Sequence, residues 1–272
     1  MLGKLIKYEF KNTAKVMLIL YAFIVAISIV GSIVLRRYWF PTNDSDIADI
    51  ATVSVLVLYI LAIFALFVIT YVYMCIHFYK TMYSDQGYLT HTLPVRPLTT
   101  LHVKLFVSMI WMLLSFVLLF LSVIGLLTGM SSGEIWQEIT SESWQEIAAI
   151  YGMSPGSLVV YMIVALFLSC MSYLLWIYAS LSIGQLFDQH KIGASVIAGV
   201  VIYIINQIIG SATLVLTGYS SSMLTNTVFM SEELYADAMN TVLYLSLLES
   251  LIGVIILYVV CNVIVRKHIN LD

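Results

Sequence analysis

Two adjacent glutamates, Glu232 and Glu233, suit hydrolytic chemistry best by type and spacing, because paired carboxylates can activate water. They would serve an intramembrane hydrolase, but no histidine lies in a neighbouring apolar stretch to complete such a site. Ser231 precedes the pair, so a helix N-cap followed by two acids in the first turn is the simpler interpretation. The histidines lack metal-ligand spacing, and no GxxxxGKS or GxxxxGKT phosphate loop occurs. We therefore expect no catalytic residue, metal or cofactor in this chain.

Glu249 is the other carboxylate of interest, because it lies inside an apolar stretch. A charged carboxylate near the middle of a bilayer costs about 2.5 to 3.5 kcal/mol on insertion scales. Glu249 either faces a cavity and holds a proton or a basic or polar part of a cargo, or it is protonated or hydrogen-bonded to Asn206 and Gln207, which lie at similar depth. Both interpretations stay open, and these three residues are our candidates for a translocation path.

The composition decides which elements position these residues. Of 272 residues, 61% are apolar and 10% are charged, and 12 Lys and Arg face 15 Asp and Glu. Such a composition excludes a water-soluble globule, a disordered chain and a nucleic-acid binder. The sequence therefore predicts an all-α integral membrane protein with one transmembrane domain over residues 1–272.

Six apolar stretches are long enough to cross the hydrocarbon core as helices. They are 16–35, 53–76, 105–128, 158–183, 195–217 and 242–265. Ten of the 12 basic residues lie in segments 1–15, 77–104, 184–194 and 266–272, whereas Arg36 and Arg37 lie on the opposite side. By the positive-inside rule, both termini of this multi-pass protein are expected in the cytoplasm.

Two of the predicted cytoplasmic segments carry further signals. Segment 1–15 places Lys4, Lys7, Lys11 and Lys15 at helical spacing, which predicts an amphipathic helix at the lipid interface or a plain orientation signal. In segment 77–104, Gly87 and Pro94 bound a short helix or turn that is too apolar for a free loop. This turn either docks into a groove on another protein or is buried on the end of the bundle.

Three stretches carry a resemblance to a known family. Residues 85–95, DQGYLTHTLPV, resemble the D-x-G-Y-L-T-x-T-L-P-V stretch of membrane subunits of ATP-binding-cassette type-2 exporters from Gram-positive bacteria, such as the phenol-soluble modulin exporters. Residues 183–191, IGQLFDQHK, and residues 5–11, LIKYEFK, are similar to the same permeases. With the six-span plan the resemblance extends over the whole chain, although only these stretches are specific.

The resemblance implies that segments 77–104 and 184–194 are cytoplasmic coupling loops or helices that bind a separate cassette ATPase. The coupling residues it implies are Asp85, Gly87, Tyr88, Leu89, Thr90, Leu93, Pro94, Arg96, Gln185, Phe187, His190 and Lys191. ATP and Mg would then bind to the partner ATPase. It also implies a second permease copy, either as a homodimer or as a related chain, in the cell membrane of a Gram-positive bacterium.

The aliphatic and aromatic spans favour a hydrophobic or amphipathic cargo, with peptide first and lipid or a hydrophobic drug behind it. Toxin export and self-protection against antimicrobial peptides are the activities that the resemblance implies. The alternatives are a membrane sensor or scaffold that transports nothing, and the intramembrane hydrolase. Small residues four apart, such as Ser195 and Gly199, are expected mainly to pack helices within one chain.

Overall fold

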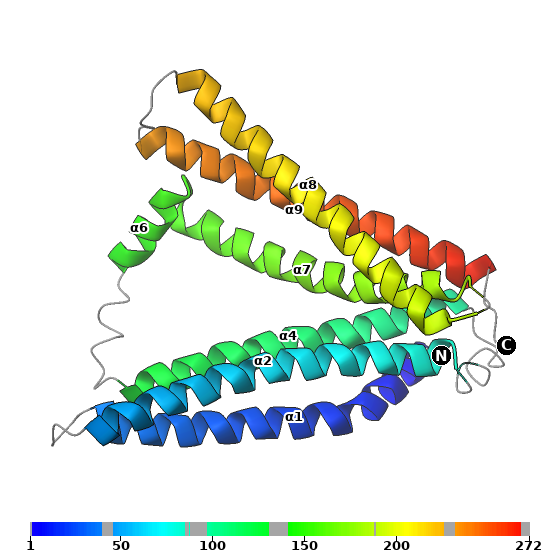
Figure 1. The fold of residues 1–272 in the computed structure, drawn as a ribbon, viewed down its shortest axis with the longest axis horizontal. Coiled ribbons are helices and arrows are strands. Elements are labelled where there is room, and N and C mark those ends of the chain that lie inside the picture. The colour runs from blue at the N-terminus through cyan, green and yellow to red at the C-terminus, as the bar shows by residue number, and fades with distance from the viewer. Residues whose placement is uncertain are drawn as a thin grey trace. The chain divides into compact units, whose positions relative to one another are not determined.

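The computed structural model describes the backbone of residues 2–39, 46–84, 87, 97–130, 141–187, 189–225 and 232–267. It describes the side chains of the same residues except 34–39, 46–49, 51–52, 127–130, 141–142, 218–225, 232–235 and 267. Within these ranges helices are the sole regular secondary structure, and short turns connect some of them. The helices are α1 (Leu2–Trp39), α2 (Asp46–Met82), α4 (Pro97–Met130), α6 (Ser141–Ile150), α7 (Pro155–Gly184), α8 (Lys191–Thr225) and α9 (Glu232–Lys267) (Figure 1).

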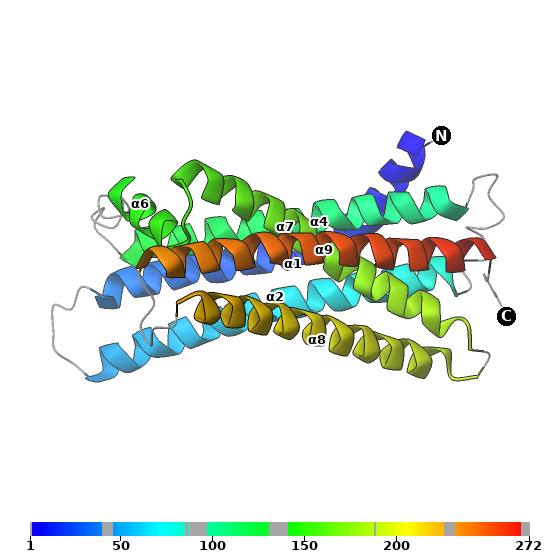
Figure 2. The same ribbon diagram turned by 90° about the horizontal axis from the view of Figure 1, so that it is seen from above.

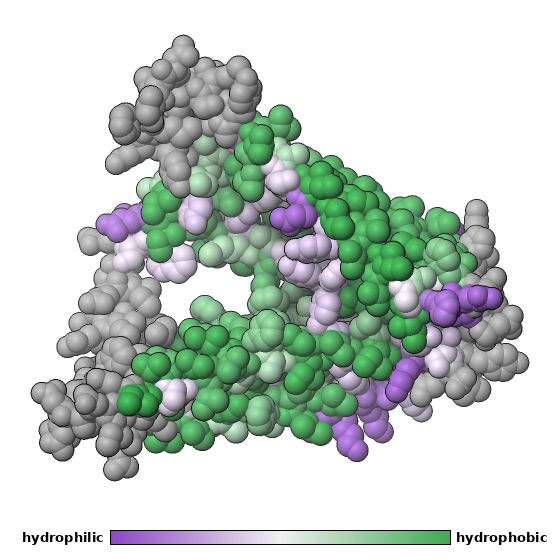
Figure 3. All heavy atoms as spheres, in the orientation of Figure 1, coloured by the Kyte–Doolittle hydropathy of each residue, from purple (hydrophilic) through white to green (hydrophobic). Residues whose placement is uncertain are grey.

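The six predicted apolar stretches all form helices that are long enough to cross a membrane. Each of these six helices contains an 18-residue window that is apolar enough for a membrane. The helical segment around each window has at least 27 residues. Hydrophobic side chains cover most of the visible face of these helices (Figure 3). All six helices extend beyond the predicted apolar stretches at both ends. The chain is therefore an all-helical protein with the elements of a multi-pass membrane protein.

Residues 2–15 form the first turns of α1 rather than a separate helix. Figure 2 shows these turns at an angle to the rest of α1. Thr13 Oγ1 donates to the carbonyl oxygens of Glu9 (3.0 Å) and Phe10 (3.2 Å) at this position, and such back-bonding often bends helices. The four lysines of this segment are exposed, whereas Leu5, Ile6 and Phe10 pack inward, so its amphipathic character is confirmed. That it lies on lipid stays a prediction.

The chain divides into two compact units, which we describe separately. The first comprises residues 1–77 and 99–139, and contains α1, most of α2 and most of α4. Its core joins all three helices through eight buried residues: Met17, Tyr21, Ile24, Leu66, Met74, Val103, Val107 and Trp111. Trp111 is its polar anchor, because its indole Nε1 donates to Thr13 Oγ1 (2.8 Å) and its carbonyl accepts from the Tyr21 hydroxyl (2.8 Å).

The second unit comprises residues 78–98 and 140–272. In it, α7 packs against α8 and α9, α8 packs against α9, and the short helix α6 packs against α7 and α9. α7 begins with Pro155 after the N-cap Ser154, whose Oγ accepts from Ser157 N (3.2 Å). Because proline lacks the donor that a first turn leaves unpaired, this start is well specified by sequence.

Candidate functional site

The end of α2 and the end of α7 are joined by a buried aromatic and hydroxyl cluster, the Tyr83 cluster (Phe78, Tyr83, Tyr178 and Ser182). The rings of Phe78 and Tyr178 stack with centroids 3.6 Å apart and an interplanar angle of 9°. The hydroxyls of Tyr83 and Ser182 lie 2.7 Å apart. Since Ser182 Oγ donates to the Tyr178 carbonyl (2.6 Å), the Tyr83 hydroxyl is the donor to Ser182. The start of the first predicted coupling loop is therefore held in a fixed position against the end of α7.

Gly87 lies just beyond this cluster, five residues after the end of α2. Its amide donates to the Ser84 carbonyl (2.6 Å). A Cβ at this position would lie 2.6 Å from the Met82 carbonyl oxygen, so a side chain does not fit without moving the backbone. The other coupling candidates of this loop, namely Asp85, Tyr88, Leu89, Thr90, Leu93, Pro94 and Arg96, lie outside the described residues.

The second predicted coupling loop starts from the same end of α7. At Gly184 a Cβ would collide with Ser195 Oγ and would lie 2.7 Å from the Lys191 carbonyl oxygen. α7 and α8 can therefore approach this closely only with glycine here. One turn further along α8, Gly199 lies against Ser180, and its carbonyl accepts from Trp176 Nε1 (2.9 Å). Ser195 and Gly199 thus pack within the chain, as predicted.

The coupling candidates on this loop have different surroundings. Gln185 is 2% exposed, and its amide atoms have no hydrogen-bond partner within the described part of the chain. Phe187 and His190 are exposed, and Lys191 is half-buried. His190 has a φ of 62°, in the left-handed region, and its carbonyl accepts from Ala194 N (2.9 Å) at the start of α8. The loop therefore presents Phe187 and His190 outward from a tightly turned backbone.

A second polar cluster, in the first unit, joins the start of α1 to the end of α2 and the start of α4. We name Glu9, His77 and Lys104 the Glu9 cluster. Glu9 Oε1 lies 2.7 Å from His77 Nε2 and 2.8 Å from Lys104 Nζ. The Lys104 side chain is 4% exposed, so this ion pair is largely desolvated. Both segments of this unit that are predicted on the cytoplasmic side, 1–15 and 77–104, therefore meet at one end of it.

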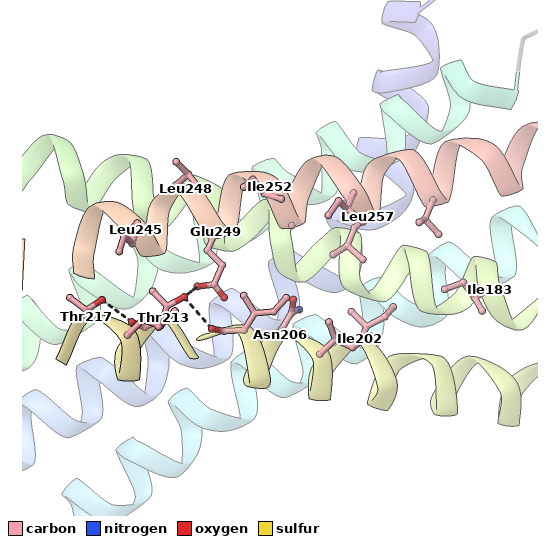
Figure 4. A pocket seen from close by; sticks show the side chains of 16 residues that line it. Ile183, Ile202, Asn206, Thr213, Thr217, Leu245, Leu248, Glu249, Ile252 and Leu257 are labelled. Atoms are coloured by element: carbon pink, nitrogen blue, oxygen red, sulfur yellow. Dashed lines mark hydrogen bonds between the residues drawn. The ribbon is translucent and has the colours of Figure 1, made fainter. Parts of the chain in front are cut away.

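Glu249 lies at the junction of two cavities in the second unit. Figure 4 shows it among the side chains that line the larger one. A larger cavity of about 510 Å³ lies mainly between α8 and α9, and a smaller one of about 330 Å³ lies among α7, α8 and α9. Asn206, Glu249, Gly253 and Leu257 line both. The carboxylate is half-buried, and its Oε2 accepts a long hydrogen bond from Thr213 Oγ1 (3.4 Å). Glu249 thus faces a cavity rather than a closed helix interface.

The two polar residues predicted beside Glu249 separate in the structure. Both are exposed, but Asn206 lines both cavities and Gln207 lines neither. The side chain that bonds Glu249 is Thr213, which stands seven residues after Asn206, on the same helix face. Position along the sequence predicted Asn206 and Gln207 as neighbours of Glu249. In the structure, Asn206 and Thr213 lie on the face of α8 that lines the larger cavity, and Gln207 does not.

The residues considered for hydrolysis and metal binding form no described site. α9 begins at Glu232, as the N-cap interpretation predicts, while the side chains of Glu232 and Glu233 lie outside the described ones. Among the residues whose positions are described, no group of three His, Cys, Asp or Glu side chains could hold a metal ion.

Sequence reasoning missed both polar clusters. Glu9 was a signal that could have found one of them, because it is the lone acid in a segment with four lysines. Nothing in the local pattern pairs Tyr83 with Ser182, which stands 99 residues away.

Comparisons of this chain with protein-family models, with curated proteins and with solved structures found no match.

Proposed function

We propose that this chain is the membrane-spanning subunit of an exporter driven by a separate cassette ATPase, and that it moves amphipathic peptides outward. The proposal takes its partner and direction from the family resemblance of residues 5–11, 85–95 and 183–191. The chain itself supplies the permease and a path, and the partner supplies ATP hydrolysis.

The observation that carries the proposal is the Tyr83 cluster. It fixes the starts of both proposed coupling loops to the same end of α7, through a ring stack and a buried hydroxyl pair. Close packing of Gly184 against Ser195 continues this connection into α8. A displacement applied to either loop would therefore move α7 and α8 together, since tightly packed helices shift as rigid bodies.

The cavities beside Glu249 lie further along these same helices, which makes them the natural part of the path to respond. Asn206 and Glu249 are the polar groups we assign to that path. Closure of the ATPases around ATP would move the loops, and α8 would shift against α9 to open or close the larger cavity. We infer that a second copy of this chain, or a related permease, completes the pathway.

We propose that the ends carrying the Glu9 and Tyr83 clusters face the cytoplasm. The positive-inside distribution supports this orientation, and so does the grouping of the predicted cytoplasmic segments at one end of the first unit. Lys4, Lys7, Lys11 and Lys15 are exposed on the first turns of α1, where they can contact anionic lipid head groups.

The test is purification of the full-length, tagged chain from its native membrane in mild detergent, followed by measurement of vanadate-sensitive ATP hydrolysis. We expect hydrolysis to accompany the chain and to rise when an amphipathic helical peptide is added, but not with a scrambled peptide of equal composition. Hydrolysis that no peptide or other hydrophobic cargo stimulates would favour a scaffold. Absence of any associated ATPase would contradict the proposal.

A further inference from the structure

We propose that α7, α8 and α9 form a binding site for a small, single-tailed amphipathic cation. Its cationic head would lie beside Glu249, and its one aliphatic tail would lie between α8 and α9. This inference goes beyond the proposed function, because it concerns a small ligand held by the chain alone and requires neither an ATPase nor transport.

The tail portion is the larger cavity, which is aliphatic on the side of Glu249 that leads toward the end of α9. The residues lining that side are Ile183, Ile202, Ile205, Ile252, Ile256 and Val260. The 11 residue steps from Glu249 to Val260 correspond to about 16 Å of helix. A single extended alkyl chain fits such a groove and buries apolar surface along it.

The head portion is the smaller cavity, which combines aromatic and hydroxyl groups. Tyr173, Trp176 and Tyr203 contribute rings, while Ser169, Ser172 and Ser250 contribute hydroxyls. The Trp176 indole is held by its hydrogen bond to the Gly199 carbonyl, and its ring lies 6.4 Å from that of Tyr203 at an angle of 46°. Fixed aromatic faces attract ammonium groups, most strongly where water is excluded.

Charge decides which amphiphile fits. Among the described residues that line the two cavities, Glu249 carries the sole carboxylate and none is basic. A cationic head would compensate the carboxylate, which is otherwise costly at this depth in a bilayer. An anionic head would meet a like charge, and the phosphate of an ordinary membrane lipid would do the same.

Glu249 is also positioned for this contact. Thr213 Oγ1 shares its proton between the Ile209 carbonyl (3.1 Å) and one carboxylate oxygen (3.4 Å). The other carboxylate oxygen lies next to Gly210, where an added Cβ would stand 3.6 Å from it. The absence of a side chain at Gly210 leaves the carboxylate accessible from α8. Four lining residues shared by both cavities make the head and tail portions continuous.

The experiment uses the purified full-length chain in phosphatidylcholine nanodiscs. Radiolabelled dodecyltrimethylammonium is the probe, and empty nanodiscs give the background from lipid partitioning. We expect saturable binding of one probe per chain. Unlabelled dodecyltrimethylammonium should displace it, whereas dodecyl sulfate and dodecyl maltoside, which share the tail but not the cationic head, should compete at least tenfold more weakly.

Matched variants locate the site. Glu249→Gln should weaken binding at least tenfold, while Glu146→Gln, the same change at an exposed glutamate on α6, should leave it unchanged. Ile256→Trp fills the tail groove seven residues beyond Glu249, about 10 Å further along α9. It should therefore weaken binding of the dodecyl probe more than that of its shorter hexyl analogue. It also carries the test if Glu249→Gln does not fold.

Equal binding by Glu249→Gln and the unaltered chain would overturn the proposal. So would equal competition by dodecyl sulfate, which would mark the groove as a general site for lipid tails. Equal effects of Ile256→Trp on the dodecyl and hexyl probes would contradict the assignment of the tail. Because the binding is measured without an ATPase, none of these results bears on the proposed export function.

Discussion

The hydroxyl of Tyr83 lies 2.7 Å from that of Ser182, and this buried hydrogen bond ties the chain segment after α2 to the last turn of α7. Tyr83 is 6% exposed and Ser182 is fully buried. Tyr83 stands at the start of the first proposed coupling loop, and Ser182 stands just before the second. We propose that an ATPase acts on the chain through these two loops. The contact can therefore be tested both as a stabilising interaction and as a mechanical connection.

Tyr83→Phe removes this hydrogen bond and keeps the ring. Because Ser182 still donates to the Tyr178 carbonyl, the expected loss is about 0.5 to 1.5 kcal/mol in the free energy of unfolding, measured by thermal unfolding in detergent. Peptide-stimulated ATP hydrolysis should fall more than basal hydrolysis. Tyr244→Phe, on the exposed face of α9, is the control. Equal behaviour of the two variants would contradict the role of the hydroxyl.

Gly184→Ala should separate α7 from α8, because the new methyl group would collide with Ser195 and crowd the Lys191 carbonyl. Overpacking of this kind costs about 1 to 3 kcal/mol. Gly156→Ala, at the other end of α7, has open space around its Cβ and should be neutral or slightly stabilising. Thermal unfolding of the two variants side by side checks this, and a Gly184→Ala variant as stable as Gly156→Ala would refute the close approach.

Lys104→Met tests the Glu9 cluster. Removing one partner of a buried ion pair leaves a carboxylate partly uncompensated, and losses of about 3 kcal/mol are typical. Glu9 retains His77, so we expect destabilisation at or below that figure. The double variant Glu9→Gln with Lys104→Met should recover at least half of the loss. A double variant less stable than Lys104→Met would show that the charge pair is not the reason.

His190→Gly should preserve or raise stability, because a non-glycine residue in the left-handed region costs on the order of 1 kcal/mol. Gln189→Gly, at the neighbouring position, gains no such relief and should lower stability slightly. If His190 contacts an ATPase, stimulated hydrolysis will fall in His190→Gly although the fold is intact. Lower stability for His190→Gly than for Gln189→Gly would contradict the backbone argument.

The sequence predicted the helices well because each apolar run exceeds the length a bilayer requires, and composition alone reports that property. Basic residues likewise indicated which helix ends belong together, as the contacts of Glu9 with His77 and Lys104 show within one unit. Lys104 was counted there as a free positive charge, although it lies buried against Glu9. A count of charged residues does not show which of them form ion pairs.

Side-chain contacts across helices were beyond sequence reasoning. Asn206 and Gln207 have the same depth, but consecutive helical residues point about 100° apart, so only one of them reaches the cavities beside Glu249. Almost uniformly apolar helices such as α7 carry no polar stripe from which the packed face could be chosen. The contact between Tyr83 and Ser182 could therefore not be predicted from the sequence. Gly87, four residues after Tyr83, could be identified as a boundary of the short helix or turn.

Our proposal depends above all on an ATP-hydrolysing partner that acts on this chain at the loop between α7 and α8. A photo-crosslinking residue in place of His190 tests it most directly, with Gln145, exposed on α6, as the matched control position. In native membranes treated with radiolabelled azido-ATP, position 190 should form a labelled adduct with an ATP-binding protein, and position 145 should form none. A labelled adduct from position 145 alone, or from neither position, would contradict the account.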